Sequence, residues 1–481
     1  MHRSRATLWA ALALALGAAL RLWFIAHANV IAGDTLLYAD IAQSWLHHGI
    51  YGFAQAEGDP LPTLIRLPGY PLFLMLCFRV FGDSNFPPVL YLQTLLDLLS
   101  ALLLADLARR LFGPRAALAA LFLATLCPFT SSYVAIPLTE TLTCATITLA
   151  FYAFSRWGSQ AAAPRSSPWN CWLWILSAAL AASVLLRPDE VLLPAALLPA
   201  MLRLTPPSPH RLRRLLPVLA AAALLTLLPL VPWTIRNART FHVFQPLAPR
   251  SATDPGEPIP TGFYRWYRTW AVDFASTEDV YWNYDGAPIQ IADLPDRAFD
   301  SATELTQTAN LLRDYNITAK ASPELDDRFN ALAQSRIRAH PLRYYVALPA
   351  ARLVNMLVRP RIEMLPIPLA WWRLSEHPAQ TAFALAYAAL NLAYLVAGIL
   401  GLHRWIRRPA APPNPAALSD SSTPIAWAMI AFVALRCALL LTLDNSEPRY
   451  TVEFFPILIL TTAALFQPQN PNPQPHLSAP G

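Results

Sequence analysis

The sequence predicts an all-α protein that crosses a membrane about ten times. Of its 481 residues, 55% are hydrophobic and only 14% are charged, a balance that a soluble enzyme of this size does not show. Apolar runs of the roughly 20 residues that a helix needs to cross the hydrocarbon core recur along the chain. One long polar interval separates the early runs from the late ones. We therefore expect a helical bundle with a small region outside the membrane.

The first apolar run covers residues 7–28. It follows Arg3 and Arg5 and continues past Arg21 without a small-residue cleavage site, which predicts an uncleaved helix and not a signal peptide. The other predicted spans are 86–108, 115–136, 139–156, 169–186, 189–203, 215–235, 379–402, 424–443 and 450–467.

Arginine placement predicts the orientation of these spans. Arginines flank alternate spans and fall on one side of the membrane in this count, and basic loops normally face the cytoplasm. Both termini are therefore expected in the cytoplasm, and the polar interval 236–377 outside. The arginines concerned are Arg3, Arg5, Arg109, Arg110, Arg115, Arg156, Arg165, Arg203, Arg211, Arg213, Arg214, Arg404, Arg407 and Arg408.

Four parts of the chain are expected. They are a transmembrane module (1–238) with a first outer loop (29–85), an extracytoplasmic region (239–377), C-terminal transmembrane helices (378–467) and a disordered tail (468–481). Residues 240–340 hold 14 acidic and 9 basic residues, while the whole chain carries a net charge of +6. The positive excess thus lies in the short loops that set topology, and nucleic acid is not an expected partner.

The extracytoplasmic region contains two further features. Residues 324–340 have the pattern of an amphipathic helix, and 341–358 form a more polar, proline-interrupted one; both are expected on the outer membrane face. An aromatic stretch has two interpretations, as a sugar-stacking surface or as an interfacial belt and local core, of which the second is favoured. Its members are Tyr264, Trp266, Tyr267, Trp270, Tyr281, Trp282 and Tyr284.

Asp34 is the most informative residue of the first outer loop. It follows the first span directly, and Tyr38, Ala42 and Trp45 recur after it at helical spacing, so Asp34 begins an amphipathic helix. An aspartate in that place is a common N-cap, which stabilises a helix by roughly 0.5–2 kcal/mol. A carboxylate at the membrane surface can also remove a proton from an acceptor group. The sequence leaves both interpretations open.

Other charged residues also occur at the outer ends of apolar segments. Glu140 opens the fourth span in PLTET, where its alternative role is that of a favourable acid in a first helical turn. Four arginines oppose the positive-inside trend, which phosphate binding would explain; each alone could instead be an interface residue. They are Arg66 in RLPGYP, Arg187 in LLRPDE, Arg236 in PWTIRN and Arg449 in EPRY.

The order of these motifs resembles the GT-C membrane glycosyltransferases that use lipid-phosphate sugars. This superfamily includes protein O-mannosyltransferases, of glycosyltransferase family 39, and lipid A aminoarabinose transferases. The resemblance covers nearly all of 1–240 and the last hundred residues. It rests on GDTLLYADIAQSWLHHGIYG, RLPGYPLFLMLCFRVFG, RRLFGPR, PLTET, LLRPDE, PWTIRN and EPRYTVEFFP.

This resemblance implies roles for individual residues. Asp34 would be the essential acid of the first outer loop, Glu140 the acid of the second, and Arg449 and Tyr450 a pair near the lipid phosphate; residues 69–82 would be a surface helix. Where the relatives have a second acid after the first, this chain has Thr35, so the resemblance leaves the acceptor class open.

We therefore expect an inverting transferase that moves a monosaccharide from a polyprenyl-phosphate carrier to a lipid, glycan or protein acceptor. Its expected location is the bacterial inner membrane, with the site facing outward. Asp34 would be the base and Glu140 would orient a substrate. Phosphate binding is expected from Arg66, Arg236, Arg449 and Tyr450, with support from Tyr38, Tyr70 and Arg187.

Two other functions compete with this one. A transporter or flippase of lipid-linked sugars could use the same charged residues, although no matching pair of broken spans is evident. A non-catalytic sensor would leave Asp34 as a cap. No organic cofactor is expected, and the sequence contains no histidine and cysteine cluster that requires a metal, so metal dependence is left open.

Overall fold

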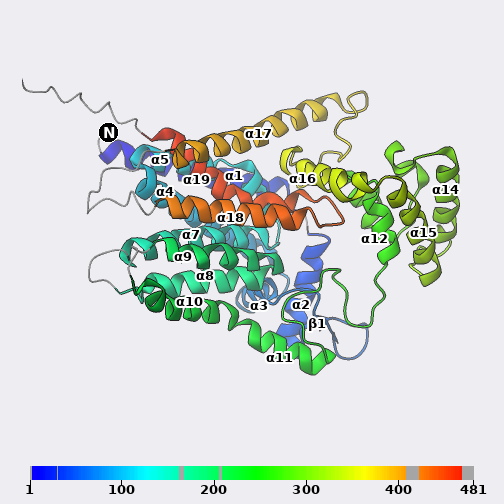
Figure 1. Cartoon of the computed structure of the whole chain (residues 1–481), viewed down its shortest axis with the longest axis horizontal. Coiled ribbons are helices and arrows are strands. Elements are labelled where there is room, and N and C mark those ends of the chain that lie inside the picture. The colour runs from blue at the N-terminus through cyan, green and yellow to red at the C-terminus, as the bar shows by residue number, and fades with distance from the viewer. Residues whose placement is uncertain (1–2, 30, 162–166, 205–208, 408–421, 468–481) are drawn as a thin grey trace, which may run out of the picture.

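The computed structural model describes residues 3–29, 31–161, 167–204, 209–407 and 422–467, and this part of the chain is mostly helical. The predicted all-α fold is therefore confirmed. The predicted tail 468–481 lies outside the described residues. Figure 1 shows the long helices side by side in a bundle, with a smaller helical region at one end.

Eleven helices precede the polar interval. They are α1 (Arg3–His27), α2 (Asp34–His48), α3 (Gly69–Phe81), α4 (Phe86–Phe112), α5 (Pro114–Thr125), α6 (Pro128–Val134), α7 (Glu140–Ala161), α8 (Cys171–Leu186), α9 (Leu192–Leu204), α10 (Arg211–Leu227) and α11 (Leu230–Phe241). Strands β1 (Gly52–Phe53) and β2 (Leu61–Pro62) form a small antiparallel hairpin in the first loop. A 3-10 helix over Pro188–Val191 joins α8 to α9.

The later helices form the region beside the bundle and the return into it. They are α12 (Thr261–Arg268), α13 (Phe274–Ser276), α14 (Ala302–Asn316), α15 (Pro323–Ala339), α16 (Leu348–Val358), α17 (Pro378–Ile406), α18 (Ser422–Leu440) and α19 (Phe455–Ala463). Short 3-10 helices cover Ile291–Asp293, Asp296–Ala298, Pro448–Phe454 and Ala464–Phe466, and π-helices cover Thr277–Tyr281 and Arg343–Ala347.

The number of membrane spans differs from the prediction. Among the described residues, five helices are long and apolar enough to cross a bilayer, or up to seven if two bent pairs each count as one span. Ten spans are therefore not confirmed. The pairs α5 with α6 and α10 with α11 bend by 50° and 46°. Proline explains both breaks, because Pro128 and Pro229 cannot donate the backbone hydrogen bond that would continue each helix.

The bundle has a large apolar core, in which α7 packs against α4 and α8, and α17 packs against α19. One charged pair lies inside it. Arg21 on α1 is fully buried; its Nε donates to Asp97 on α4 at 2.7 Å, and its Nη1 donates to the Thr125 carbonyl at 2.7 Å. A buried arginine at this depth needs such a partner. The pair therefore fixes α1 against α4 and α5.

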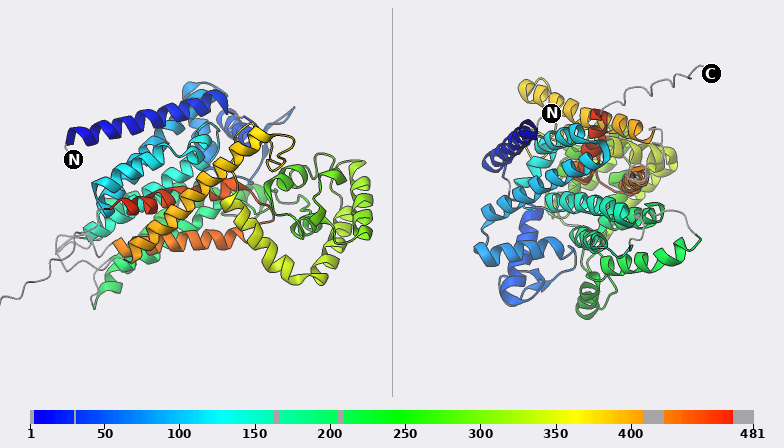
Figure 2. Two further views of the ribbon diagram at one scale, coloured as in Figure 1. Left: turned by 90° about the horizontal axis from the view of Figure 1, so that it is seen from above. Right: turned by 90° about the vertical axis from the view of Figure 1, so that its left-hand side faces the viewer.

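The helical region beside the bundle has a core of its own, built around Phe263, Trp266, Tyr267 and Phe329. Most of the aromatic stretch is buried here, which favours the interpretation as a local core over a sugar-stacking surface. The predicted amphipathic helix over 324–340 is observed as α15. Figure 2 shows this region projecting from one end of the bundle in a view turned by 90°.

Candidate active site

Asp34 begins α2, but it is not the cap of that helix. The N-cap residue is Gly33, whose positive φ of 55° suits glycine, and no side chain caps the helix. The Asp34 carboxylate instead accepts a hydrogen bond from Arg66 Nη2 at 2.7 Å and pairs through its other oxygen with Arg449 Nη1 at 2.7 Å. The interpretation of Asp34 as an N-cap is therefore wrong.

The two arginines reach Asp34 from distant parts of the chain. Arg66 lies in the loop before α3, while Arg449 lies in the 3-10 helix before α19. Burial alone would raise the pKa of Asp34, but the guanidinium groups of Arg449 and Arg66 outweigh it and hold that pKa well below its usual range. Asp34 is consequently an ionised carboxylate bound by two cations.

Tyrosines and a second carboxylate surround this group. The Arg66 guanidinium lies 5.8 Å from the centre of the Tyr38 ring, and burial raises the pKa of Tyr38 to about 12. Tyr38 in turn packs edge-on against Tyr70, whose hydroxyl donates to Gln93 at 2.9 Å. Glu447 pairs with the Nε of Arg449. Arg449 therefore bridges two carboxylates.

Glu140 belongs to a neighbouring group. It is 1% exposed, its Oε1 accepts from Arg187 Nη1 at 3.1 Å, and its Oε2 has no hydrogen-bond partner among the described residues. Arg187 also lies 3.2 Å from Glu453. The Tyr450 ring connects the two groups, since the Arg187 and Arg449 guanidinium groups both lie 5.7 Å from its centre.

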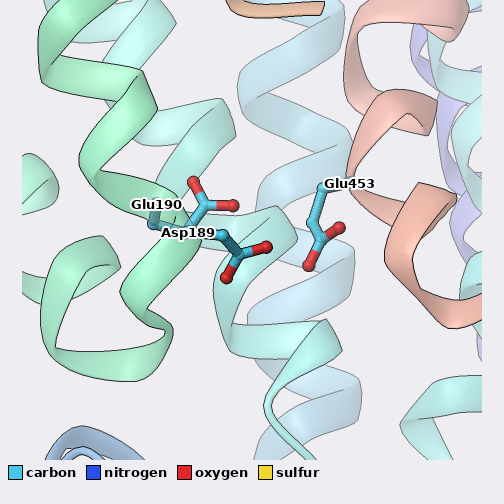
Figure 3. A group of neighbouring side chains, drawn as sticks. All are labelled: Asp189, Glu190 and Glu453. Atoms are coloured by element: carbon cyan, nitrogen blue, oxygen red, sulfur yellow. The ribbon is translucent and has the colours of Figure 1, made fainter. Parts of the chain in front are cut away.

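A third set of charges, not predicted, lies behind Arg187. Figure 3 shows Asp189, Glu190 and Glu453 with their carboxylates turned toward one another. Arg436 of α18 donates to all three, at 3.0 Å to Asp189, 2.5 Å to Glu190 and 2.6 Å to Glu453. The signal in the sequence was Arg436 itself, because a charge inside an apolar span needs a partner.

These three carboxylates also form the group best suited to a metal ion among the described residues. One oxygen from each lies within 4.8 Å of the others, and oxygen ligands suit hard divalent cations. The Arg436 guanidinium already supplies positive charge to every member, and Arg187 adds more. No metal requirement follows from this arrangement.

Arg236, by contrast, is not brought into contact with Asp34. Its guanidinium donates to the carbonyls of Thr63 at 2.7 Å and Tyr51 at 2.6 Å, and it lies 5.3 Å from the Trp233 ring. These bonds hold the β1–β2 hairpin against α11. Of the predicted residues, Arg66, Arg449 and Tyr38 thus gather at Asp34, Tyr70 packs behind them, and Glu140, Arg187 and Tyr450 adjoin them.

The contacts of Arg236 lead to a testable prediction. Arg236→Gln should raise the KM for a lipid-phosphate donor less than about threefold, whereas Arg66→Gln should raise it roughly tenfold or more. The reason is that only the Arg66 guanidinium is placed to form a charge-assisted hydrogen bond with the phosphate. Arg236→Gln should instead lower the unfolding temperature, since two carbonyls lose their donor. Initial rates and thermal unfolding in detergent measure both; an equal rise in KM for the two variants would contradict this division.

Comparison with known proteins finds a family model that matches part of the chain. Residues 62–235 match the family model described as dolichyl-phosphate-mannose-protein mannosyltransferase. The resemblance to GT-C glycosyltransferases is thereby confirmed for this stretch. It contains Arg66, Tyr70, Glu140 and Arg187 and excludes Asp34. A comparison with proteins of curated function gives no match.

Solved structures of similar proteins include ArnT from Cupriavidus metallidurans in the apo state, at 17% identity over 92% of this chain and 78% of that one, with a TM-score of 0.41. The structure of the same protein bound to undecaprenyl phosphate is 17% identical over 92% of this chain and 77% of that one, with a TM-score of 0.40. The Archaeoglobus fulgidus oligosaccharyltransferase, in complex with zinc and sulfate, is 13% identical over 95% of this chain, with a TM-score of 0.46. The match covers 48% of the length of that enzyme. At these identities and TM-scores, the likeness assigns no role to any residue of this chain.

Proposed function

We propose that this protein transfers a monosaccharide from a polyprenyl-phosphate carrier to an acceptor on the outer face of the membrane, with inversion at the anomeric carbon. The observation that carries the proposal is the convergence of Arg66 and Arg449 on Asp34. Two guanidinium groups that face one carboxylate provide both parts of the reaction, a cationic site for a phosphate and an adjacent base.

In the free protein, Asp34 takes the place that the donor phosphate would occupy. A carboxylate held by two arginines is a weak base, because its charged form is strongly stabilised. When the donor binds, Arg66 and Arg449 turn to the phosphate, and Asp34 loses part of that stabilisation. Its pKa rises, and it becomes able to accept a proton. Donor binding thus prepares the base for the reaction.

The chemical step is a single displacement. The acceptor oxygen forms a bond to the anomeric carbon as its proton passes to Asp34, and the bond from that carbon to the phosphate oxygen breaks. The electron pair stays on the polyprenyl phosphate, whose new charge Arg66 and Arg449 stabilise. Glu140 has a buried oxygen without a partner, which can accept a bond from a sugar hydroxyl and orient it. Arg187 and Tyr450 hold Glu140 and Arg449 in place.

The direct test supplies purified protein in detergent with radiolabelled undecaprenyl-phosphate sugars and a panel of lipid, glycan and peptide acceptors. Release of undecaprenyl phosphate together with label on an acceptor is the expected result. In vesicles, movement of the labelled donor across the bilayer without cleavage of the sugar–phosphate bond would support a flippase instead. Neither cleavage nor movement would leave the protein as a non-catalytic binder.

The proposed exchange of partners predicts two different pH profiles. In the free enzyme Asp34 stays ionised down to pH 5, because its pKa lies well below its usual range, so kcat/KM for the donor should show no acid limb from Asp34. In the donor complex its pKa is higher, so kcat should fall as the pH is lowered and Asp34 becomes protonated. The donor is a phosphodiester and does not titrate in this range.

Steady-state rates between pH 5 and pH 8 measure both profiles, with thermal unfolding as the control for stability. The contribution of Asp34 to folding stability is present above its unfolded pKa of about 3.9 and is lost only as the pH falls toward its depressed folded pKa. It should therefore stay constant between pH 5 and pH 8. Identical profiles for kcat and kcat/KM would contradict the exchange of partners.

A further inference from the structure

A cavity of about 350 Å³ lies between the segment around α13, the 3-10 helix Asp296–Ala298, α16 and the loop before α17. This volume falls within the range of small-molecule binding sites. Six side chains give it its character, and they come from segments far apart in the chain. They are Asp273, Arg297, Asn355, Arg359, Trp371 and Trp372.

Arg359 is the unusual member of this set. It is 5% exposed, yet the only hydrogen bond of its side chain among the described residues joins Nε to the carbonyl of Pro360 at 3.3 Å, and no carboxylate there lies within ion-pair distance. Its guanidinium lies 5.1 Å from the centre of the Phe274 ring. Burial lowers the pKa of Arg359 by more than the Glu363 and Asp273 carboxylates, which lie beyond ion-pair distance, raise it. The two terminal nitrogens remain available to a ligand in the cavity.

The charges of the lining indicate the charge of that ligand. Arg297 is paired with Asp273, which leaves Arg359 as the uncompensated cation of the lining residues. Arg361 and Glu363, which follow Arg359 in the chain, add one positive and one negative charge and therefore no net charge. Arg361 bonds to Thr451 and to the Pro448 carbonyl, while Glu363 accepts from Tyr133 at 3.0 Å. One unit of negative charge would balance the lining. A carboxylate has that charge and matches the planar fork of arginine, whereas a phosphate monoester carries about −1.5 to −2.

The remaining lining residues indicate a sugar. The Trp371 and Trp372 rings lie 6.0 Å apart at 83°, and Trp372 is 51% exposed. An exposed indole face provides a surface on which the apolar face of a sugar ring can pack, and the amide of Asn355 can bond to hydroxyl groups. The Trp371 carbonyl accepts from Thr381 at 2.7 Å, which holds this loop against α17.

A short chain of contacts joins the cavity to the reaction site. Ser446 Oγ lies 3.2 Å from Asn355 Oδ1, and Ser446 is followed by Glu447, which pairs with Arg449. Arg449 in turn holds Asp34. The cavity is thus linked to the proposed base through Ser446, Glu447 and Arg449.

We infer that this cavity binds a carboxylate-bearing sugar of the acceptor, with the carboxylate on Arg359 and the ring against Trp372. The assignment of this sugar to the acceptor rests on the proposed function; the binding site itself does not. No covalent step occurs in the cavity. Its role is to hold an acidic glycan so that a neighbouring hydroxyl can reach Asp34.

Calorimetric titration of the full chain in detergent tests the binding site without any donor. The probes are glucuronate, glucose and glucose 6-phosphate at pH 7.5. Glucuronate should bind at least roughly tenfold more tightly than glucose, because it adds charge-assisted bonds to Arg359, and also more tightly than glucose 6-phosphate. Equal affinity of the native chain for glucuronate and glucose, or a preference for glucose 6-phosphate, would overturn the inference without any variant.

Variants locate the binding. Arg359→Gln should abolish the preference for glucuronate over glucose, while Arg313→Gln, at an exposed arginine of α14, should retain it. Trp372→Ala changes a half-exposed residue and should weaken glucuronate and glucose alike, which gives a second variant if Arg359→Gln does not fold. Retention of the full preference in folded Arg359→Gln, or undiminished binding in Trp372→Ala, would overturn the inference.

The same preparations separate this inference from the proposed function. Release of undecaprenyl phosphate from a sugar donor is measured with acceptor glycans that contain or lack glucuronate. Faster release with the glucuronate glycan supports the assignment to the acceptor, and equal release overturns it. Arg359-dependent binding without release from any donor would overturn the proposed function and leave the binding site intact.

Discussion

Asp34→Asn is expected to reduce sugar transfer by roughly 10²- to 10⁴-fold, the loss associated with removal of a general base. Asparagine keeps the shape of the side chain but cannot take up the proton that leaves the hydroxyl of the sugar acceptor. The variant should still bind undecaprenyl phosphate at least as tightly as the native chain, because Arg66 and Arg449 no longer have a competing carboxylate. Turnover and binding of the carrier measure the two effects independently.

Asp40→Asn is the matched control for this substitution. Asp40 lies on the same helix, and among the described residues its carboxylate accepts only from the backbone nitrogen of Ala54, at 3.3 Å. This variant should keep most of the activity. Full turnover by Asp34→Asn would refute the assigned base, whereas loss of both turnover and carrier binding would indicate that Asp34 holds the arginines in place and does not itself take a proton.

Arg436→Gln is expected to have the largest effect on stability, about 3–5 kcal/mol, because it leaves buried carboxylates without their counterion. Arg436 is 1% exposed and binds Asp189, Glu190 and Glu453, which come from two segments about 260 residues apart in the chain. Its removal leaves Arg187, which pairs with Asp189 and Glu453, as the one cation beside these carboxylates among the described residues, and leaves Glu190 without an arginine. Thermal unfolding and the yield of monodisperse protein in detergent measure the loss.

The control and the rescue make this prediction specific. Arg109→Gln removes an arginine whose side chain is 55% exposed and pairs with Asp106 three residues earlier, so it should cost no more than about 1 kcal/mol. Adding Glu190→Gln to Arg436→Gln should recover part of the stability, because Glu190 is the carboxylate of this group that Arg187 does not pair with among the described residues. A double variant no more stable than the single one would show that the charge of Glu190 does not cause the loss.

The positions of the helices could be predicted because their cause is local. Apolar runs, proline breaks and the amphipathic pattern of α15 each depend on neighbouring residues, so they were visible in the sequence. The number of spans could not be predicted in this way, because a run such as 115–136 has the composition of one helix while Pro128 divides it into α5 and α6. The role of Gly33 as the N-cap was also missed, because aspartate in the next position fits the same pattern.

The candidate site was predicted in part. Asp34, Arg66 and Arg449 were selected because each is a charge at an apolar boundary, and the structure brings them together. Arg236 satisfied the same criterion, yet its guanidinium bonds to the carbonyls of a hairpin. Glu447, Glu453 and Arg436 were missed, although Arg436 within an apolar run was a signal of the same kind.

The sequence by itself determined that this is a helical membrane protein and which charged residues must find partners, because solvation in a bilayer depends on each residue's own chemistry and its near neighbours. Only the tertiary structure decided which charges meet. Arg449 contacts Asp34 from more than 400 residues away, and only the placed helices show that Arg359 has no carboxylate partner among the described residues. Such pairing depends on distances that sequence spacing does not encode, and on this pairing depend both the proposed base and the proposed acceptor site.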